Sequence, residues 1–486
     1  MTGTPPSLSP RLAAAYEPES FRAQGHALVD RLADHLQQCQ QRALATSYPA
    51  PEPAEERAFW AERLAASDVS LEDLLQLTLA RSNQLHDPRY MGHQVAVPMP
   101  SSALVGLLTD LLNNGQAIYE MGPSNAALEE LLMAEIGEAL GLPTGCGGIL
   151  CHGGTIGNLV ALLAAQRKWA PETWAEGVAA ARPVAVFVSA QAHYCVDRAV
   201  RLLGWGEGAV VQIPTDPHHR IRLDELERLA DQARREGRHP LAVVGSACTT
   251  STGAFDPLEG MADWAEANGV WFHVDGAHGA PAAFSDTHRH LVTGMGRADS
   301  VVMDFHKLCG LPALCTGVFY RSVGSSYLPF VQQAEYLWSN AAGTDWWDTG
   351  KRTLECTKRM LSTRLAAVRA EHGWSIWGEL VDRLFATASA FAAEIEVRAG
   401  WELAMPPQAN IVCFRPVDAA TGRKERLAAL RQAYLRDGSG YIVATSFDGE
   451  HWLRCTFMNP LTEPADFCQM LDELTLLLAT PQFANK

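Results

Sequence analysis

Several features that would place a chain in a special class are missing from this 486-residue sequence. It has no run of eighteen apolar residues, so we expect no helix that spans a membrane. Basic residues are fewer than acidic ones, 39 against 55, and the net charge of −16 disfavours nucleic acid or an anionic membrane as partner. Residues 1–10 lack the basic stretch and apolar core of a secretory signal. We therefore expect a cytoplasmic protein.

The eleven cysteines form no Cys-x-x-Cys pair, and their number is odd. They are scattered from Cys39 to Cys468. This pattern favours reduced, mostly buried thiols over a disulfide framework or a zinc site. The histidine pairs at 218–219 and 288/290 have no acidic or cysteine residues in a supporting pattern, so we predict no metal site.

The composition, 47% hydrophobic and 19% charged, is typical of a globular protein, and the length suggests about three domains. The N-terminal part is predicted to be helical, because apolar residues between Phe21 and Leu36 recur at helical spacing. Residues 47–56 are a Pro-rich linker, and residues 59–79 are again predicted to be helical. No core precedes these helices, so we expect them to form an arm that packs on another subunit.

From about residue 100 the sequence alternates between helical patterns and short β-rich runs. Such alternation predicts a largely parallel sheet covered by helices. After residue 355 a long helical stretch leads into a C-terminal α+β segment with the strand candidates "NIVCFRP" and "WLRCTFMNP". The earlier strand candidates are 184–190, 209–214, 241–248, 270–278, 300–305 and 317–322.

Polar residues follow several of these strands, where open α/β sheets bind their ligands. Two glycines and a threonine open a helix, a place where free N–H groups can bind phosphate. A structural role, such as a turn cap, explains any one of these residues, but together they indicate one ligand site. The set is Gly153, Gly154, Thr155, His193, Thr249, Thr250, Asp275, His306 and Lys307.

Pyridoxal phosphate is a cofactor that needs this combination. It requires an amine to form an imine, an anion beside its ring nitrogen, a flat side chain over the ring and a cradle for its phosphate. Lysine is hardly ever fully buried unpaired, and Lys307 joins two apolar runs. An imine would remove its isolated charge and so explain its position.

Seven segments in order resemble the group II pyridoxal-phosphate-dependent amino acid decarboxylases. This family includes glutamate, aromatic amino acid, diaminobutyrate and cysteine sulfinate decarboxylases. A single segment is weak evidence, whereas the ordered series is specific. The segments are "DPRYMGH", "YEMGPSNAALE", "HGGTIGNLVAL", "SAQAHYCVDRA", "HVDGAHG", "DFHKL" and "LRCTFMNP".

The resemblance implies roles for individual residues in binding pyridoxal 5′-phosphate. Lys307 forms the imine, Asp275 pairs with the ring nitrogen, and His193 stacks on the ring face. The other implied cofactor contacts are Gly154, Thr155 and His306 at the phosphate and Thr250 near the ring hydroxyl.

For the substrate, the resemblance implies that Arg454 meets the α-carboxylate and that His93 lines the side-chain pocket. Tyr336, in the long segment 322–352, matches the tyrosine of a mobile catalytic loop and would protonate the α-carbon. The expected reaction is α-decarboxylation of an L-amino acid to its amine and CO2. Acidic, diaminobutyrate-like and aromatic substrates all stay open, with a polar or acidic one ranked slightly ahead.

Two neighbouring reactions remain as alternatives within the same resemblance. One is decarboxylation-dependent oxidative deamination, as in aldehyde synthases, which is associated with loss of the loop tyrosine; Tyr336 disfavours it. The other is a different reaction on the same fold, such as transamination. A non-catalytic scaffold is a further class, but the residues that cofactor chemistry needs are all present.

The fold implied by the resemblance is α/β, of the fold type I class. It comprises an N-terminal helical arm (1–85), a large domain with a mixed, mostly parallel seven-stranded sheet (86–370) and a small C-terminal α+β domain (371–486). The family is dimeric, so we expect a homodimer with its active site at the subunit interface and a small-molecule amino acid as substrate.

Overall fold

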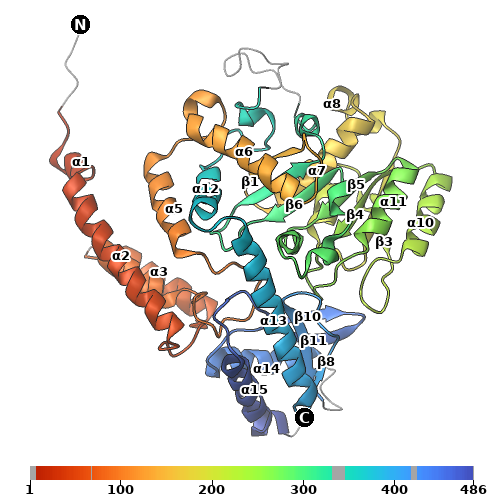
Figure 1. Ribbon diagram of the computed structural model, residues 1–486. Helices are drawn as coiled ribbons and strands as arrows, with labels where there is room; N and C mark the ends of the chain where they lie inside the picture. Colours follow the sequence, from red (N-terminus) through yellow and green to blue (C-terminus); the bar gives the residue numbers. More distant parts are fainter. Residues whose placement is uncertain (1–6, 67, 331–344, 418–423, 485–486) are drawn as a thin grey trace.

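The computed structural model describes residues 7–66, 68–330, 345–417 and 424–484. Within these ranges the chain forms a helical N-terminal arm, a large α/β body and a smaller C-terminal α+β part (Figure 1). All eleven cysteines are unpaired and nine are buried, as the sequence pattern predicted. In the described ranges, no helix has both the length and the apolar character needed to cross a membrane.

The arm consists of helices with favourable N-terminal residues. The first three have proline in their first turn, where its missing N–H costs no hydrogen bond. The predicted helix over 59–79 is divided between two helices, the second of which begins with a capping box between Ser70 and Asp73. The helices are α1 (Pro10–Ala14), α2 (Pro18–Gln40), α3 (Pro53–Ala65) and α4 (Leu71–Arg81).

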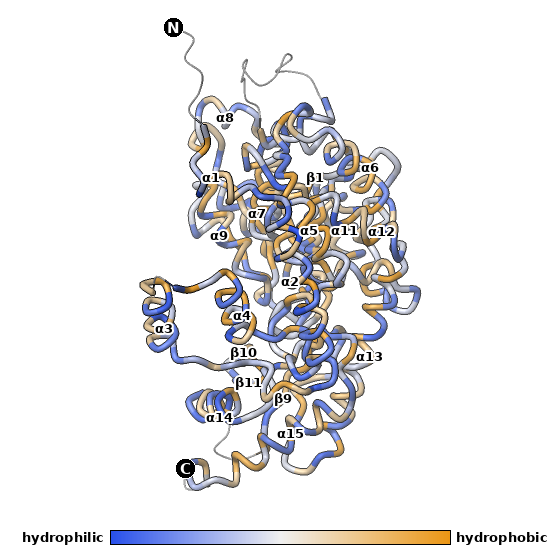
Figure 2. The backbone as a smooth tube through the Cα atoms, turned by 90° about the vertical axis from the view of Figure 1, so that its left-hand side faces the viewer, coloured by the Kyte–Doolittle hydropathy of each residue, from blue (hydrophilic) through white to orange (hydrophobic). Residues whose placement is uncertain are grey.

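The apolar stripe of the arm is largely uncovered in the single chain. Only Cys39 of α2 is buried, and Phe21 on the same helix is 49% exposed. Helices α2 and α3 project from the body in Figure 1, and Figure 2 shows α3 and α4 standing apart from it. The arm therefore presents apolar side chains that its own chain does not cover.

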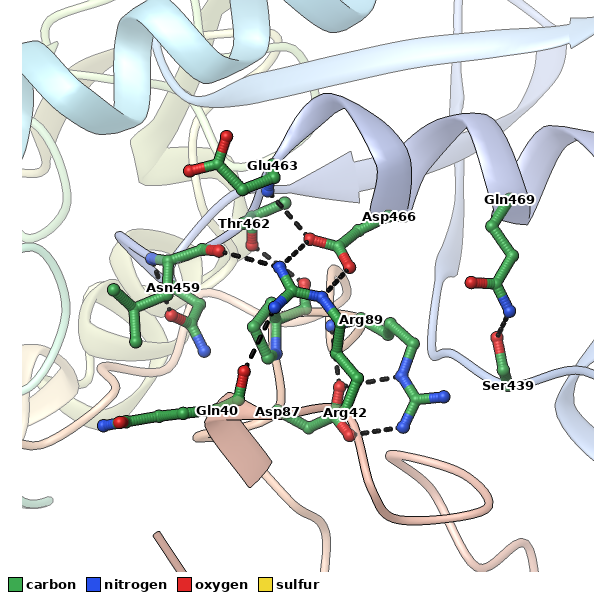
Figure 3. Close-up of polar contacts among 12 residues, drawn as sticks. Gln40, Arg42, Asp87, Arg89, Ser439, Asn459, Thr462, Glu463, Asp466 and Gln469 are labelled. Atoms are coloured by element: carbon green, nitrogen blue, oxygen red, sulfur yellow. Dashed lines mark hydrogen bonds and ion pairs between the residues drawn. The ribbon is translucent and has the colours of Figure 1, made fainter. Parts of the chain in front are cut away.

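The segment that follows α2 is fixed to the C-terminal part by an ion pair with a buried carboxylate (Figure 3). Arg42 donates to both carboxylate oxygens of Asp466, with Nε–Oδ1 2.5 Å and Nη2–Oδ2 2.7 Å. Arg89 pairs with Asp87 at 2.6 Å and also donates to the Leu44 carbonyl at 2.7 Å. Because Asp466 and Asp87 are buried, these bonds fix where the arm leaves the body.

The large body contains a seven-stranded sheet of order β1-β7-β6-β5-β4-β2-β3. β7 runs antiparallel to both neighbours and every other neighbouring pair is parallel, which confirms the mixed, mostly parallel sheet. The six predicted strands correspond to β2–β7, whereas β1 was not predicted. The strands are β1 (Gly147–Cys151), β2 (Val184–Ser189), β3 (Val210–Ile213), β4 (His239–Ser246), β5 (Trp271–Asp275), β6 (Ser300–Asp304) and β7 (Thr316–Tyr320).

Helices cover both faces of this sheet. On one face α6, α10 and α11 pack in a core with Phe187 and Phe272, and on the other α7 and α9 pack against Val186 and Val302. The sheet edge formed by the carboxyl ends of the parallel strands meets the N-terminus of α7. The helices of the body are α5 (Pro100–Leu112), α6 (Pro123–Ala139), α7 (Gly154–Trp169), α8 (Thr173–Glu176), α9 (Cys195–Leu202), α10 (Leu223–Arg235), α11 (Leu258–Asn268) and α12 (Ser362–His372).

The C-terminal part contains an antiparallel sheet of order β10-β11-β9-β8. Helix α13 connects it to the body, since Trp377 packs in the core of the body and Phe391 in the C-terminal core. Tyr90 and Met91 also pack in the C-terminal core, and the boundaries at 85/86 and 370/371 stay predictions. The elements are α13 (Ser375–Val397), β8 (Trp401–Leu403), β9 (Ile411–Pro416), α14 (Lys424–Asp437), β10 (Val443–Phe447), β11 (Glu450–Thr456), α15 (Pro464–Leu478) and α16 (Pro481–Ala484).

Candidate active site

A cavity of about 280 Å³ lies at the carboxyl ends of β1, β4, β5 and β6, beside the N-terminus of α7. Its position follows from the topology, because these strands end at one edge of the sheet. The residues that the sequence analysis selected at strand ends all line it, namely Gly153, Gly154, Thr155, His193, Thr249, Thr250, Asp275, His306 and Lys307.

Lys307 lies in the wall of this cavity with a carboxylate partner. Its Nζ is 3.0 Å from Oδ2 of Asp304, which ends β6. Burial lowers the pKa of Lys307, but the carboxylates of Asp304 and Asp275 outweigh burial, so its pKa lies above the usual value. The Thr316 hydroxyl donates to the other Asp304 oxygen at 2.5 Å and holds that carboxylate in place.

Asp275 and His193 face the same cavity from β5 and from the loop after β2. Asp275 Oδ1 accepts a hydrogen bond from the Ala277 N–H at 3.2 Å. His193 Nδ1 accepts from the Cys195 N–H at 3.3 Å, which leaves Nε2 to carry the proton of the neutral ring. Burial lowers the pKa of His193 and favours that neutral form.

The glycines at the start of α7 allow a close approach to the cavity. Gly153 has φ +107°, and a Cβ on Gly154 would lie 3.0 Å from Asp304 Oδ2. Thr155 is in the first turn of the helix, where the N–H groups of residues 154 and 155 have no partner among the described residues, whereas the Ile156 N–H donates to the Gly153 carbonyl at 3.0 Å. The His306 ring is held by its Nδ1, which is 2.9 Å from the Cys315 carbonyl oxygen. This end of the cavity can bind an anion.

Arg454, on β11, is a buried cation that adjoins the cavity. Its residue surface is 7% exposed, and its Nη1 donates to the Thr250 carbonyl at 2.7 Å. Burial lowers its pKa, and no carboxylate is among the groups that raise it. In the described part of the chain its Nε is buried without a partner. Because an unpaired buried charge is costly, this guanidinium calls for an anion in the cavity.

His93 does not line the cavity but lies near Arg454, at the edge of the C-terminal part. Its Nε2 is 2.9 Å from the hydroxyl oxygen of Tyr441, whose ring stacks on Tyr90 at 4.8 Å. Burial, followed by the charges of Arg454 and Arg431, lowers the pKa of His93 and favours its neutral form. The structure thus brings His93 to the Arg454 side of the site.

Tyr336, the predicted proton donor, lies outside the described residues.

Several polar residues of the cavity were not predicted from the sequence, and three of them are ionisable. Asp304 precedes Lys307 by three residues, and the strand-end rule that selected Asp275 could have found it. His152 directly precedes the glycines, and its Nδ1 is 3.0 Å from Glu355 Oε1. His278 is 2% exposed and lies three residues after Asp275. All three line the cavity.

The proton position on His278 can be derived from its neighbours. Asn410 Nδ2 donates to the Phe457 carbonyl at 2.7 Å, so its Oδ1 accepts from His278 Nε2 at 2.8 Å. Burial lowers the pKa of His278 to about 3, so the ring is neutral and Nδ1 is an acceptor. That nitrogen is buried and has no partner among the described residues.

Comparison with known proteins identifies what this arrangement resembles. Residues 70–417 match the family described as "Pyridoxal-dependent decarboxylase conserved domain". The chain is 31% identical over 445 residues to the cysteine sulfinic acid decarboxylase of Mus musculus, covering 88% of this chain and 90% of that protein. It is 28% identical over 410 residues to an L-aspartate decarboxylase of Metarhizium robertsii, covering 83% and 80%.

Solved structures of other proteins have the same fold as this chain. The crystal structure of mouse CSAD superposes with a TM-score of 0.87 at 27% identity, covering 95% of this chain and 99% of that one. The structure of Oryza sativa TDC with PLP and tryptamine has a TM-score of 0.85 at 21% identity, covering 97% and 99%. At 21% identity, the match to the Oryza sativa structure is evidence for the fold alone.

Proposed function

The chain belongs to the pyridoxal-dependent decarboxylase family, and on that premise we propose that it removes the α-carboxylate of an acidic L-amino acid. As a member it is a carboxy-lyase whose cofactor is pyridoxal 5′-phosphate. The proposal adds the substrate class, the roles of individual residues and the assembly.

The residues of the cavity fit this cofactor. Lys307 and Asp275 open onto one space of about 280 Å³, so a single small molecule can meet an amine and a carboxylate there. Glycine at 154 lets the start of α7 approach the Asp304 carboxylate closely, and the free N–H groups at this helix N-terminus suit a phosphate. The buried acceptor on His278 adds a site for a donor. Lys307 would hold the cofactor covalently through its ε-amino nitrogen.

Other side chains would orient the cofactor. Asp275 would stabilise positive charge on the ring nitrogen, and His193 would cover one ring face. Gly154, Thr155 and His306 would bind the phosphate, and Thr250 would lie near the ring hydroxyl. When bound, pyridoxal phosphate supplies an electron-withdrawing ring that accepts the electron pair left as CO2 departs.

Arg454 carries the substrate part of the proposal. It is a buried guanidinium with no carboxylate partner in the described part of the chain, and it adjoins the cavity through Thr250. The α-carboxylate of an amino acid would supply the missing charge. His93, held by Tyr441, would contact the substrate side chain. The named relatives, which act on cysteine sulfinic acid and aspartate, support an acidic side chain.

Proton delivery completes the proposed reaction. Tyr336 would give a proton to the α-carbon, so that the bond to the carboxylate is replaced by a bond to hydrogen. The products are the amine and CO2.

The proposed assembly is a homodimer with the active site at the subunit interface. Uncovered apolar side chains on α2 and α5 support it, since a monomeric protein rarely leaves such faces open. The predicted packing of the arm on a second subunit belongs to the same proposal.

A panel of amino acids tests the substrate assignment. We expect purified protein with bound cofactor to release CO2 faster from aspartate, cysteine sulfinate or glutamate than from their amides or from aromatic amino acids. The measurement is CO2 release, together with amine, aldehyde and hydrogen peroxide. Lys307→Ala should lose both turnover and borohydride-fixable cofactor. Faster release from a neutral or aromatic amino acid would overturn the acidic assignment.

A further inference from the structure

A second cavity, of about 190 Å³, lies beside the first, between the C-terminal end of α5 and the start of α12. His152 forms part of the wall of both cavities. The second cavity is polar, with Thr109 and Asn113 on the α5 side and Lys358, Arg359 and Arg364 on the other. None of these five residues has a role in the proposed cofactor site.

Two of its three cations are neutralised within the fold. Lys358 is fully buried, pairs with Glu129 and donates to the Leu150 carbonyl at 2.9 Å. Arg359 pairs with Asp110 at the exposed rim. Because two of the cations are paired, the positive charge of the third is not balanced within the cavity.

Arg364 is that third cation. Its residue surface is 9% exposed, and its guanidinium forms no hydrogen bond or ion pair with any residue in the described ranges. The guanidinium lies against α5, where its Nη2 is 3.4 Å from the position of a Cβ on Gly106. None of its nitrogens is among the buried atoms without a partner, so the guanidinium is open to the cavity and available to an anion that the chain does not itself provide.

The backbone around Arg364 also favours a bound anion. Arg364 is the third residue of α12, an eleven-residue helix whose N-terminus carries partial positive charge. A cation in the first turn is therefore unfavourable unless an anion lies close to both. Side chains on a helix lean toward its N-terminus, which directs this guanidinium to the cavity.

We propose that the second cavity binds a small oxyanion through Arg364. The volume of about 190 Å³ has room for a carboxylate, sulfinate, sulfate or phosphate group. The oxyanion comes either from solution or from the distal acidic group of the substrate. The second source rests on the proposed function; the first does not.

Sulfate titrated into the cofactor-loaded protein at constant ionic strength tests the site without turnover. We expect saturable binding by calorimetry, weakened at least about tenfold in Arg364→Gln, because hydrogen bonds to a charged group are lost. Arg364→Lys keeps the positive charge, so its affinity for sulfate should stay within about tenfold of the wild type. Arg359→Gln is the matched control, since it lines the same cavity but is exposed and paired, and should stay within about threefold of the wild type.

Steady-state kinetics separate the two sources. If the substrate supplies the oxyanion, sulfate competes with the acidic amino acid. Arg364→Gln then lowers kcat/KM for the acidic amino acid about tenfold and leaves kcat/KM for the corresponding amide unchanged. If the ion comes from solution, the variant changes kcat/KM for acid and amide by one common factor. Either result supports binding at Arg364.

Two results would overturn the proposal. One is sulfate binding that is absent, or equal in wild type and Arg364→Gln. The other is a wild-type dimer that dissociates in Arg364→Gln during sedimentation, because the missing counter-ion would then be a carboxylate of the second subunit. Failure to find any decarboxylated amino acid would leave the sulfate result intact and would count against the proposed function alone.

Discussion

At the scale of single residues, the structure gives Lys307 a partner that the sequence analysis had not assigned. From the sequence, an imine explains the burial of Lys307, and Asp275 is expected at the far end of the cofactor. Asp304 holds the ammonium at 3.0 Å and is itself held by Thr316. Burial alone would lower the pKa of this lysine, so Asp304 opposes burial and keeps the ammonium protonated.

We therefore expect Asp304→Asn to speed the capture of pyridoxal phosphate by the apoprotein below about pH 10, the usual range of a lysine pKa. The substitution removes the negative charge that raises the pKa of Lys307, leaving burial and Asp275, so more of the amine is neutral and nucleophilic at a given pH. The measurement is the rate of appearance of the cofactor absorption against pH, and this profile should shift to lower pH.

Asp286→Asn serves as the control, because this carboxylate is exposed and pairs with Arg289 on the surface. It should leave the pH profile unchanged. An unchanged profile in Asp304→Asn would show that this carboxylate does not govern the lysine.

At the scale of elements, β1 shows why one strand escaped prediction. It begins with two glycines, which have poor β propensity, and it precedes a turn that also contains two glycines. A Cβ on Gly148 would lie 2.6 Å from both Met133 Cε and the Val318 carbonyl oxygen. Close packing of α6 and β7 requires glycine there, and neither contact is visible in a local pattern.

Helix α13 offers a test of packing between the two parts of the chain. A Cβ on Gly378 would lie 2.2 Å from the Phe284 carbonyl oxygen, so Gly378→Ala must move the helix or the adjoining turn. We expect a loss of about 1–3 kcal/mol in the free energy of unfolding, as for other overpacked sites. The measurement is the urea midpoint.

Gly25→Ala is the matched control on α2, where nothing lies within 4 Å of the added Cβ. Because alanine favours a helix, this variant should gain up to about 1 kcal/mol. Equal midpoints for the two variants would contradict the packing argument.

At the scale of the whole molecule, α5 carries an exposed apolar face. Leu104, Leu108 and Leu111 on this helix are 57%, 49% and 64% exposed. Apolar faces of this kind are typical of interfaces, which supports the proposed dimer. The C-terminal end of α5 also borders the second cavity, which shares His152 with the candidate active-site cavity, so we expect loss of the dimer to affect activity as well.

We expect Leu108→Glu combined with Leu111→Glu to give a monomer in analytical ultracentrifugation, because two carboxylates would be buried at the interface. Turnover should fall with the dimer. Leu202→Glu on α9 is the control, since Leu202 is 67% exposed and lies on a different helix. A double variant that sediments as the wild type does would place the interface elsewhere.

The sequence by itself determined the fold class, the family and the cofactor, through its helical and β patterns, the polar residues after its strands and the order of its motifs. These are local signals, since periodicity and strand ends are written in neighbouring residues. Only the tertiary structure decided which charges are paired. Lys307 with Asp304, Arg454 beside Thr250 and the uncompensated Arg364 depend on how the folded chain surrounds each group, because burial sets the cost of each charge.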